Sequence, residues 1–336
     1  MKTFSYSVVI RTLGNTGQKY NALLQSIKKQ TIQPEEIIVV IPEGYTLDFQ
    51  LGYEKIIYSK KGMITQRAIG IKKAKPDYIL VVDDDIDFSE TMVEELYDYM
   101  LKNNLDVCFP MEGVPTEDDL TNGKENFEWP FSKILRSAFT GQMFISNKES
   151  DFLDVITVTA GHKVFTKNKY KDRCYLCQTG NFQCHFIKTK LAQSLHLEDE
   201  LWLEKGTISS YSSFDDPVYY YGLFLKGARM AYSLRTRYRH LDAGAGRPAK
   251  SKLEEKRIRY YTMAKNRTIF WYKYLWKPAK TFTRKVTVLI GGLYGTVNYT
   301  LFSIAVSIQP KYWKAIAAMF EGYRHAYNYI RHGSVL

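Results

Sequence analysis

Two periods of apolar residues take turns along the first hundred positions. Short apolar runs at 5–10, 35–41, 54–59, 78–82 and 106–110 have the length and composition of buried strands. Between them, segments 17–30, 63–75 and 89–103 repeat apolar residues at helical spacing, as Tyr20, Leu23, Leu24 and Ile27 do. Alternation of this kind predicts a mostly parallel sheet with helices on both faces.

The pattern is less regular beyond residue 110. Residues 111–172 mix turn residues, aromatics and both periods, and they predict no clear elements. Regular signals return from residue 184. Residues 215–229 predict a helix that starts at two aspartates, and 230–244 predict a strand that leads into a glycine-rich loop.

The C-terminal part has a different pattern. Basic residues are dense from 247 to 285, and 286–308 then run uncharged for roughly the length that spans a bilayer. Residues 311–332 are amphipathic and basic. The uncharged segment could span the membrane once, lie in its surface or be a buried helix. We favour a peripheral or re-entrant hairpin with Pro310 near its turn.

Composition narrows the class of protein. The chain has 336 residues, of which 45% are hydrophobic, and a formal net charge of +12. Such a charge suits nucleic acid, an anionic membrane surface or a phosphorylated ligand. We expect no nucleic-acid partner, because the basic residues cluster beside an apolar segment rather than among aromatic residues. The N-terminus lacks the long apolar stretch of a signal peptide, which predicts a catalytic part in the cytoplasm.

Three consecutive aspartates end the apolar run at 78–82. Asp83, Asp84 and Asp85 repel one another, so a positive group should lie near them. Two carboxylates in an Asp-X-Asp pattern can hold a divalent cation against phosphate oxygens, and Mg²⁺ and Mn²⁺ prefer such ligands. The alternative is a solvated acidic turn at the start of a helix.

The order of these motifs resembles the family 2 inverting glycosyltransferases, which have the GT-A fold. The resemblance lies in 7–40, 62–89 and 215–244, spanning roughly 5–245 with a poor match near 111–172. It implies a Rossmann-like α/β catalytic domain at 1–245, with a donor half at about 1–110 and an acceptor half at about 111–245. A C-terminal helical, membrane-associated extension would then occupy 246–336. Residues 260–274 also resemble an arginine-asparagine region that follows the catalytic domain in bacterial members.

The resemblance assigns residues to the donor and the metal. It implies that Asp83, Asp85 and His240 bind Mg²⁺ or Mn²⁺, and that Asp83 also faces the nucleotide ribose. The donor, a UDP- or dTDP-sugar, would lie against Arg11, Thr12, Glu43, Arg67, Asp83 and Asp84. Glu43 stands in an "IPEG" turn where the family has an acidic "DDGS"-like turn, and this departure leaves the base open.

The same resemblance assigns the acceptor side. Asp216 would be the general base and Asp215 a supporting residue, because inversion requires a carboxylate that takes a proton from the acceptor hydroxyl. Gln178, Thr179 and Gly180 would line the acceptor site. The acidic pair within 198–202 is a rival. The alternative role for the aspartates at 215 and 216 is stabilisation of a helix N-terminus.

The predicted function is transfer of a sugar to a glycan acceptor carried on a polyprenyl-diphosphate lipid, at the cytoplasmic face of the membrane. It would serve capsule, O-antigen or other surface polysaccharide synthesis. Two rival functions are a phosphatase of the haloacid dehalogenase type and a non-catalytic membrane-bound scaffold. A zinc site is a further alternative, built from Cys174, Cys177, Cys184 and His185.

Overall fold

The structure is a computed structural model that describes residues 4–113, 152–164, 174–207, 212–241 and 251–335. The chain forms two compact units. The first unit comprises 1–124, 166–199 and 223–247, and the second comprises 125–165, 200–222 and 248–336. These units do not coincide with the predicted domain at 1–245 and extension at 246–336. That division stays a prediction.

The first unit is built on a mixed sheet, in the order β3-β2-β1-β4-β10-β6-β11-β9. Its strands are β1 (Tyr6–Arg11), β2 (Glu36–Pro42), β3 (Lys55–Ser59), β4 (Tyr78–Asp83), β6 (Val107–Glu112), β9 (Tyr175–Cys177), β10 (Cys184–Lys188) and β11 (Met230–His240). Strands β1 to β4 are parallel, β10 is antiparallel to β4 and β6, and β11 is parallel to β6. The short strand β5 (Ile86–Phe88) pairs antiparallel with β11.

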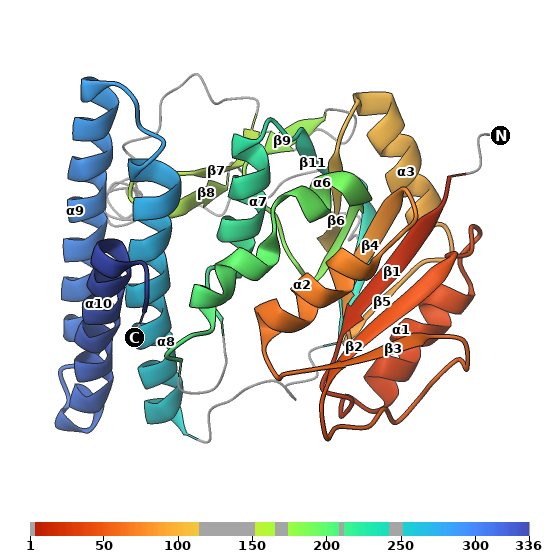
Figure 1. The fold of residues 1–336 in the computed structure, drawn as a ribbon, viewed down its shortest axis with the longest axis horizontal. Helices are drawn as coiled ribbons and strands as arrows, with labels where there is room; N and C mark the ends of the chain where they lie inside the picture. Colours follow the sequence, from red (N-terminus) through yellow and green to blue (C-terminus); the bar gives the residue numbers. More distant parts are fainter. Residues whose placement is uncertain (1–3, 114–151, 165–173, 208–211, 242–250, 336) are drawn as a thin grey trace, which may run out of the picture. The chain divides into compact units, whose positions relative to one another are not determined.

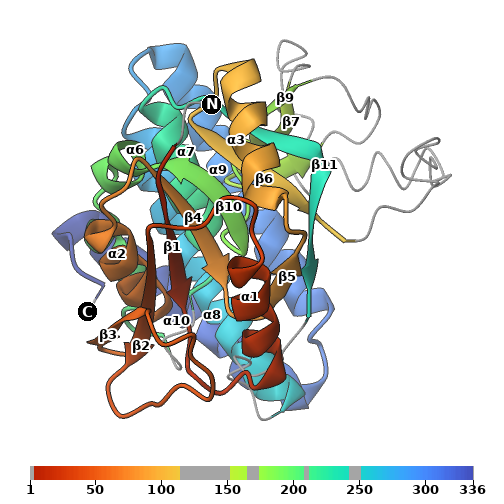
Figure 2. The same cartoon turned by 90° about the vertical axis from the view of Figure 1, so that its right-hand side faces the viewer.

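Helices cover both faces of this sheet, as the alternating pattern predicts. Figures 1 and 2 show α1 (Gln18–Lys28) and α3 (Met92–Asn103) on one side and α2 (Met63–Lys73) on the other. Side chains of β1 alternate accordingly: Tyr6, Val8 and Ile10 belong to the core under α1 and α3. Gly70 of α2 comes so close to Val9 that a Cβ there would lie 2.5 Å from it. The short helix α6 (Thr189–Ser194) follows β10 and packs against α2.

One detail of α3 differs from the sequence. The spacing favours Ser89 as the residue that begins this helix, but the helix begins after Thr91, and no side chain caps it. Ser89 instead uses its backbone carbonyl to accept a hydrogen bond from the Gln30 side chain at 2.7 Å. That contact fixes the turn before the helix to the end of α1.

The second unit is mainly helical. It contains the hairpin of β7 (Phe152–Ile156) and β8 (His162–Val164), most of α7 (Asp215–Leu225), α8 (Lys252–Phe270), α9 (Phe282–Ala305) and α10 (Trp313–His332). A 3₁₀ helix, η3 (Leu197–Leu203), enters the unit, and the turn η5 (Pro310–Tyr312) joins α9 to α10. A turn at Pro310 between two helices was predicted, and this part of the hairpin is confirmed.

Helix α8 is the central element of the second unit. It packs along α10, where Tyr260, Ala264, Ala315 and Met319 form a small core. It begins at Ser251, whose hydroxyl accepts a hydrogen bond from the backbone N–H of Glu254 at 3.2 Å. At its other end it continues into a π-helical segment, η4 (Trp271–Trp276), in which Trp271 and Trp276 stack.

Candidate active site

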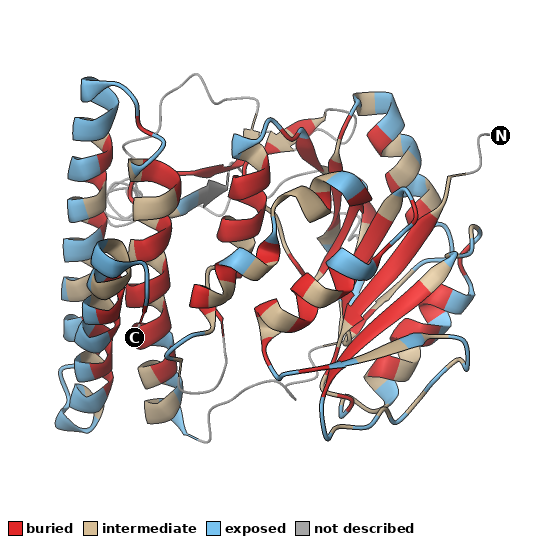
Figure 3. Ribbon diagram, viewed as in Figure 1, coloured by how far each residue is buried: buried red, intermediate tan, exposed pale blue. Residues whose placement is uncertain are grey.

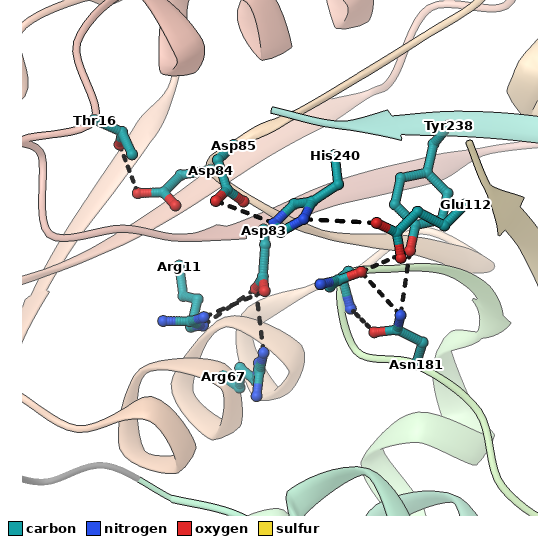
Figure 4. Close-up of polar contacts among 11 residues, drawn as sticks. Arg11, Thr16, Arg67, Asp83, Asp84, Asp85, Glu112, Asn181, Tyr238 and His240 are labelled. Carbon is teal, nitrogen blue, oxygen red and sulfur yellow. Dashed lines mark hydrogen bonds and ion pairs between the residues drawn. The ribbon is translucent and has the colours of Figure 1, made fainter. Parts of the chain in front are cut away.

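The three consecutive aspartates end β4 and take three different partners. Figure 4 shows Asp83 between two arginines, Asp84 beside the Thr16 hydroxyl and Asp85 beside a histidine. All of these residues belong to the first unit. The repulsion that the sequence raises is therefore relieved by separate partners for each carboxylate.

Asp83 is held between two arginines. Arg11 from β1 approaches it at 3.2 Å, and Arg67 from α2 donates to its Oδ1 at 3.1 Å. Burial alone would raise the pKa of Asp83, but the two guanidinium groups hold this pKa below its usual value. The side chain of Arg67 is only 3% exposed and lies over the Phe182 ring, 4.2 Å from its centroid. The Asp83 carboxylate thus balances a buried positive charge.

Asp84 is fixed by the loop that follows β1. Thr12 and Thr16 donate their hydroxyls to its Oδ2 at 2.5 and 2.8 Å. Burial raises the pKa of Asp84, although both hydroxyls and Arg11 oppose that rise. The hydroxyl of Thr12 also accepts the backbone N–H of Gly14 at 2.8 Å. Asp84 therefore orders the loop over which a donor base was predicted to lie.

Asp85 faces His240. Its Oδ2 lies 3.2 Å from His240 Nε2, and the other ring nitrogen, Nδ1, lies 3.7 Å from Glu112 Oε1. The sheet register brings them together: β5 pairs Ile86 with His240, and β6 pairs Glu112 with Tyr238 of β11. The backbone N–H of Leu241 also donates to the Asp85 carbonyl at 2.7 Å. Three strand ends thus place two carboxylates on either side of one imidazole.

This arrangement suits a divalent cation at Asp85 and His240 better than at Asp83. Carboxylate oxygen and imidazole nitrogen are ligands that Mn²⁺ accepts, and the two side chains are partly exposed, at 16% and 24%. Both oxygens of Asp83 already face arginines. Among the described residues, no group of three or more His, Cys, Asp or Glu side chains is close enough to form a ready-made metal site.

The remaining predicted donor and acceptor residues occupy two loops. Glu43 is exposed and follows β2, where its N–H donates to the Ser59 carbonyl at 2.8 Å. Gln178 and Thr179 are buried between β9 and β10. Gly180 faces Phe109 so closely that a Cβ would lie 2.1 Å from the ring. The same loop continues into a network in which Tyr238 donates to Gln183 at 2.7 Å.

Asp215 and Asp216 lie in the first turn of α7, in the second unit. Asp215 is buried, and Asp216 is half-buried. In the same unit, His162 of β8 lies 3.3 Å from Asp154 of β7. The hydrogen bond to Asp154 raises the pKa of His162, and the charge of Asp216 adds to that rise. The N-terminal placement predicted for the pair is confirmed, whereas its catalytic role stays a prediction.

The rival acidic pair has structural partners. Glu198 forms a surface ion pair with Lys72 at 2.9 Å. Glu200 is 3% exposed and accepts hydrogen bonds from Trp202, Lys273 and Tyr274 at 2.5, 2.5 and 2.7 Å. Glu200 therefore holds η3 against the π-helical segment η4 that follows α8.

The zinc alternative is not supported within the described part of the chain. Cys174, Cys177, Cys184 and His185 all lie in it, and no metal-binding cluster occurs there. Burial lowers the pKa of His185 to about 3, and it raises the pKa of Cys184. A neutral imidazole and a protonated thiol in the core are consistent with packing roles.

Comparison with known families covers the part of the chain that contains the three aspartates. The family model described as "Glycosyl transferase family 2" matches residues 7–152. This part of the chain is similar in sequence to the family 2 glycosyltransferases. The resemblance drawn from the sequence is thereby confirmed, and so is a mixed α/β fold with a central sheet flanked by helices.

One curated relative of this chain is the poly(ribitol-phosphate) beta-N-acetylglucosaminyltransferase TarP of Staphylococcus aureus (strain N315). The two chains are 27% identical over 120 residues, which is 32% of this chain and 36% of the relative. The match thus spans about a third of the length of that relative. Similarity at this level covers one part of each protein.

Two solved structures to which this chain is similar have low sequence identity to it. S. aureus TarS 1-349 in complex with UDP-GlcNAc is 13% identical, with a TM-score of 0.47 over 98% of this chain and 92% of that chain. GalNAc-T7 with UDP, GalNAc and Mn²⁺ is 15% identical, with a TM-score of 0.48 over 91% of this chain and 58% of that chain.

Sequence reasoning missed Glu112 in this candidate site. The residue ends β6 and points toward His240, as Figure 4 shows. A signal was present, because Glu112 is the carboxylate that follows the buried run at 106–110. Acidic residues at the carboxyl ends of neighbouring parallel strands converge on one edge of a sheet. Only the pairing of β6 with β11 shows which histidine it meets.

Proposed function

We propose that this protein is an inverting glycosyltransferase that moves a sugar from a nucleotide-diphosphate donor to a glycan acceptor during synthesis of a bacterial surface polysaccharide. The family 2 match supports sugar transfer. Similarity to TarP, a poly(ribitol-phosphate) beta-N-acetylglucosaminyltransferase, supports a cell-surface polymer as the acceptor. One observation carries the proposal: within the first unit, the Asp85–His240 pair lies beside Asp83 and its two arginines.

In this proposal Asp85 and His240 hold Mg²⁺ or Mn²⁺. Glu112 faces the other ring nitrogen of His240, Nδ1. A bound cation would stabilise the negative charge of the departing diphosphate. Asp83, which the sequence analysis assigned to the metal, here has the two arginines as its partners instead. Its carboxylate orients Arg11 and Arg67, so that the exposed edge of Arg11 can face donor phosphate or ribose oxygens.

The donor loop supports nucleotide selection. The Thr12–Asp84–Thr16 contacts hold the chain after β1 in a fixed path. We assign this loop to the base of a UDP- or dTDP-sugar, with Glu43 at the neighbouring turn. A rigid loop lowers the entropy lost when the base is bound.

The acceptor side is assigned to the aspartate pair and the loop after β9. Asp216 takes the proton from the attacking hydroxyl, Asp215 supports it, and Gln178, Thr179 and Gly180 line the acceptor site. A single in-line displacement at the anomeric carbon needs such a base on the face opposite the leaving diphosphate. The acceptor we propose is a polyprenyl-diphosphate-linked glycan, because such glycans lie at the membrane surface where this chain has a matching face.

That matching face is the outer side of α9. By length and composition α9 is the one described helix that could cross a membrane. Its other side is docked along the second unit: a Cβ at Gly291 would lie 2.5 Å from Val158, and one at Gly292 would lie 2.3 Å from Trp271. Trp271 also donates its indole N–H to the Val288 carbonyl at 2.9 Å. A helix held along its length in this way is suited to lie in the surface.

The outward side of α9 is exposed, as the pale blue edge in Figure 3 shows, and its exposed large residues are apolar. Its exposed large residues, together with those of the following turn, are Phe282, Val286, Leu289, Ile290, Leu293, Val297, Leu301, Phe302, Ile304, Val306 and Ile308. Exposed basic residues flank both ends, with Lys280, Arg284 and Lys285 at one and Lys311 and Lys314 at the other. We therefore propose that α9 lies in the headgroup region of an anionic bilayer at the cytoplasmic face.

A thermal-shift experiment tests the donor and metal assignment. Nucleotide diphosphates with Mn²⁺ should raise the melting temperature of the wild type, since a ligand that binds only the folded state stabilises it. Asp85→Ala should lose the Mn²⁺-dependent part of this shift. Asp87→Ala is the matched control, because Asp87 lies two residues on and pairs with Arg239 at 2.9 Å instead. No nucleotide-dependent shift in the wild type would refute the donor assignment.

Vesicle sedimentation tests the membrane assignment. The wild type should bind vesicles that contain phosphatidylglycerol and bind pure phosphatidylcholine weakly. A double change of Leu293→Glu and Val297→Glu should release it, whereas Leu101→Glu, an exposed apolar position in the first unit, should not. Equal binding by both variants would contradict the assignment of α9.

A further inference from the structure

A strained aromatic residue lies directly before the aspartate pair of α7. Phe214 has a φ of 75°, a left-handed conformation that costs a bulky residue on the order of 1–3 kcal/mol. Its carbonyl accepts the backbone N–H of Val218 at 3.2 Å, so Phe214 begins the helix that carries Asp215 and Asp216. Such a conformation persists only where the surroundings hold it.

A buried asparagine on α8 provides part of that hold. Asn266 is fully buried, and its Nδ2 donates to the Ser213 carbonyl at 2.7 Å and to the Leu203 carbonyl at 3.3 Å. The Phe214 ring then packs edge-on against Phe270, one turn further along α8, with 5.3 Å between ring centroids. Helix α8 thus fixes both the Ser213 carbonyl, directly before the strained residue, and the ring of Phe214 itself.

The neighbouring lysine grips the other end of the same segment. Lys265 is also fully buried, and its Nζ donates to the carbonyls of Trp202, Leu203 and Lys205 at 2.9, 3.3 and 2.5 Å. These carbonyls end η3 and form the turn after it. Two consecutive residues of α8 therefore bind residues 202–205 and 213, which lie on either side of the stretch that leads into α7.

We propose that Lys265 and Asn266 form a clamp that positions the aspartates at the start of α7 for catalysis. This inference rests on the proposed function, in which Asp216 is the general base. Neither clamp residue is a catalytic residue, since both act through the backbone of the segment before α7. The clamp supplies what the strained turn needs: fixed carbonyl partners on both sides and a fixed ring contact.

The expected effect is on the chemical step. A base displaced by about 1 Å loses on the order of 100-fold in rate, because proton transfer and attack require close alignment. Asn266→Ala should therefore lower kcat by roughly 10- to 100-fold. It should leave donor affinity, measured by nucleotide-dependent thermal shift, within twofold, because the donor residues belong to the other unit.

A combined variant separates positioning from a general loss of structure. If Asn266 acts through Asp216, then Asn266→Ala should change the residual rate of Asp216→Asn by less than twofold, since the two changes remove one function. Thr262→Val is the matched control. Thr262 is buried one turn earlier on α8 and binds the Ile258 carbonyl of its own helix at 2.7 Å. It should keep kcat within twofold even if the melting temperature falls.

A second variant covers poor folding of Asn266→Ala. In Phe214→Gly the left-handed turn is free of strain but has lost its ring contact, so kcat should fall several-fold with little change in stability. Two results would overturn the clamp alone. One is a wild-type kcat in both Asn266→Ala and Phe214→Gly, and the other is an equal loss of rate when Asn266→Ala is made in the wild type and in Asp216→Asn. Full turnover in Asp216→Asn would instead overturn the base assignment, and the clamp with it.

Discussion

The two units solve the problem of a buried positive charge in opposite ways. In the first unit Arg67 is balanced by the carboxylate of Asp83. In the second unit Lys265 has backbone carbonyls for partners, and so has Arg267, which donates to the Thr159 carbonyl at 2.7 Å. A carboxylate carries a full charge, whereas a carbonyl carries only a partial one.

The pKa values follow this difference. The arginines hold the pKa of Asp83 low, so its pair stays charged from neutral pH well into the acidic range. Burial lowers the pKa of Lys265 to about 7, because three carbonyls do not make up for lost water. The first unit therefore has a charge arrangement suited to meeting a charged ligand, and the second has one that holds backbone in place and responds to pH near neutrality.

The largest effect should come from breaking the carboxylate pair. Asp83→Asn leaves Arg67 buried without its counter-charge, which should destabilise the first unit by roughly 3–5 kcal/mol. Urea unfolding at pH 7 measures this loss. Wild-type stability should also fall toward that of the variant as acid protonates Asp83, since a carboxyl with a lowered folded pKa loses its contribution only below the usual range.

The control for this change is Asp106→Asn. Asp106 pairs with Lys188 at 2.7 Å, but both side chains are partly exposed, at 29% and 41%. An exposed pair of this kind contributes about 1 kcal/mol or less. Equal losses from the two variants would show that burial of Arg67 does not set the strength of the Asp83 pair.

A smaller effect should appear in the pH dependence of the second unit. Lys265 has a folded pKa below its unfolded value, so between about pH 7 and the usual lysine range the unfolded chain binds more protons. Stability should therefore rise with pH across this window, by at most about 1.4 kcal/mol per pH unit. Lys265→Met should remove that slope in urea unfolding at a series of pH values. An unchanged slope would assign it to another group.

The smallest effect should come from Glu112. Its side chain is half exposed and lies 3.7 Å from His240, beyond hydrogen-bond distance. Glu112→Gln should weaken Mn²⁺ binding, measured by calorimetry, by a few-fold, whereas His240→Ala should weaken it by 10-fold or more. Identical losses would place Glu112 among the direct ligands.

The sequence predicted the first unit well up to residue 110. Periodicity located β1 to β4 and the helices between them, because β1, β2 and β4 are buried on both faces and each reads as one apolar run. It did not predict that β10 runs antiparallel between β4 and β6, since strand order depends on long-range pairing. Residues 114–151, which belong to the predicted acceptor half at about 111–245, lie outside the described residues.

The sequence predicted which residues belong to the candidate site, but only some of the contacts among them. Asp85 and His240 do lie together, and Asp83 lies beside Arg11 and Arg67, but as their counter-ion. The sequence analysis identified residues 260–274 as a motif but predicted no contacts for them. Asn266 has no local sign of its role, because the carbonyls it binds lie more than fifty residues away.

The π-helical segment at Trp271–Trp276 has a consequence for how the chain tolerates insertions and deletions. A π turn contains more residues than an α turn, so the extra residue is taken up within the turn. One residue removed there would restore ordinary pitch and leave Trp271 and the tryptophan stacked on it, five positions later, facing nearly the same way. One residue removed from a regular turn of α8 would instead turn everything beyond it by about 100° around the axis. Length at this spot is thus less strictly set than in the regular turns before it.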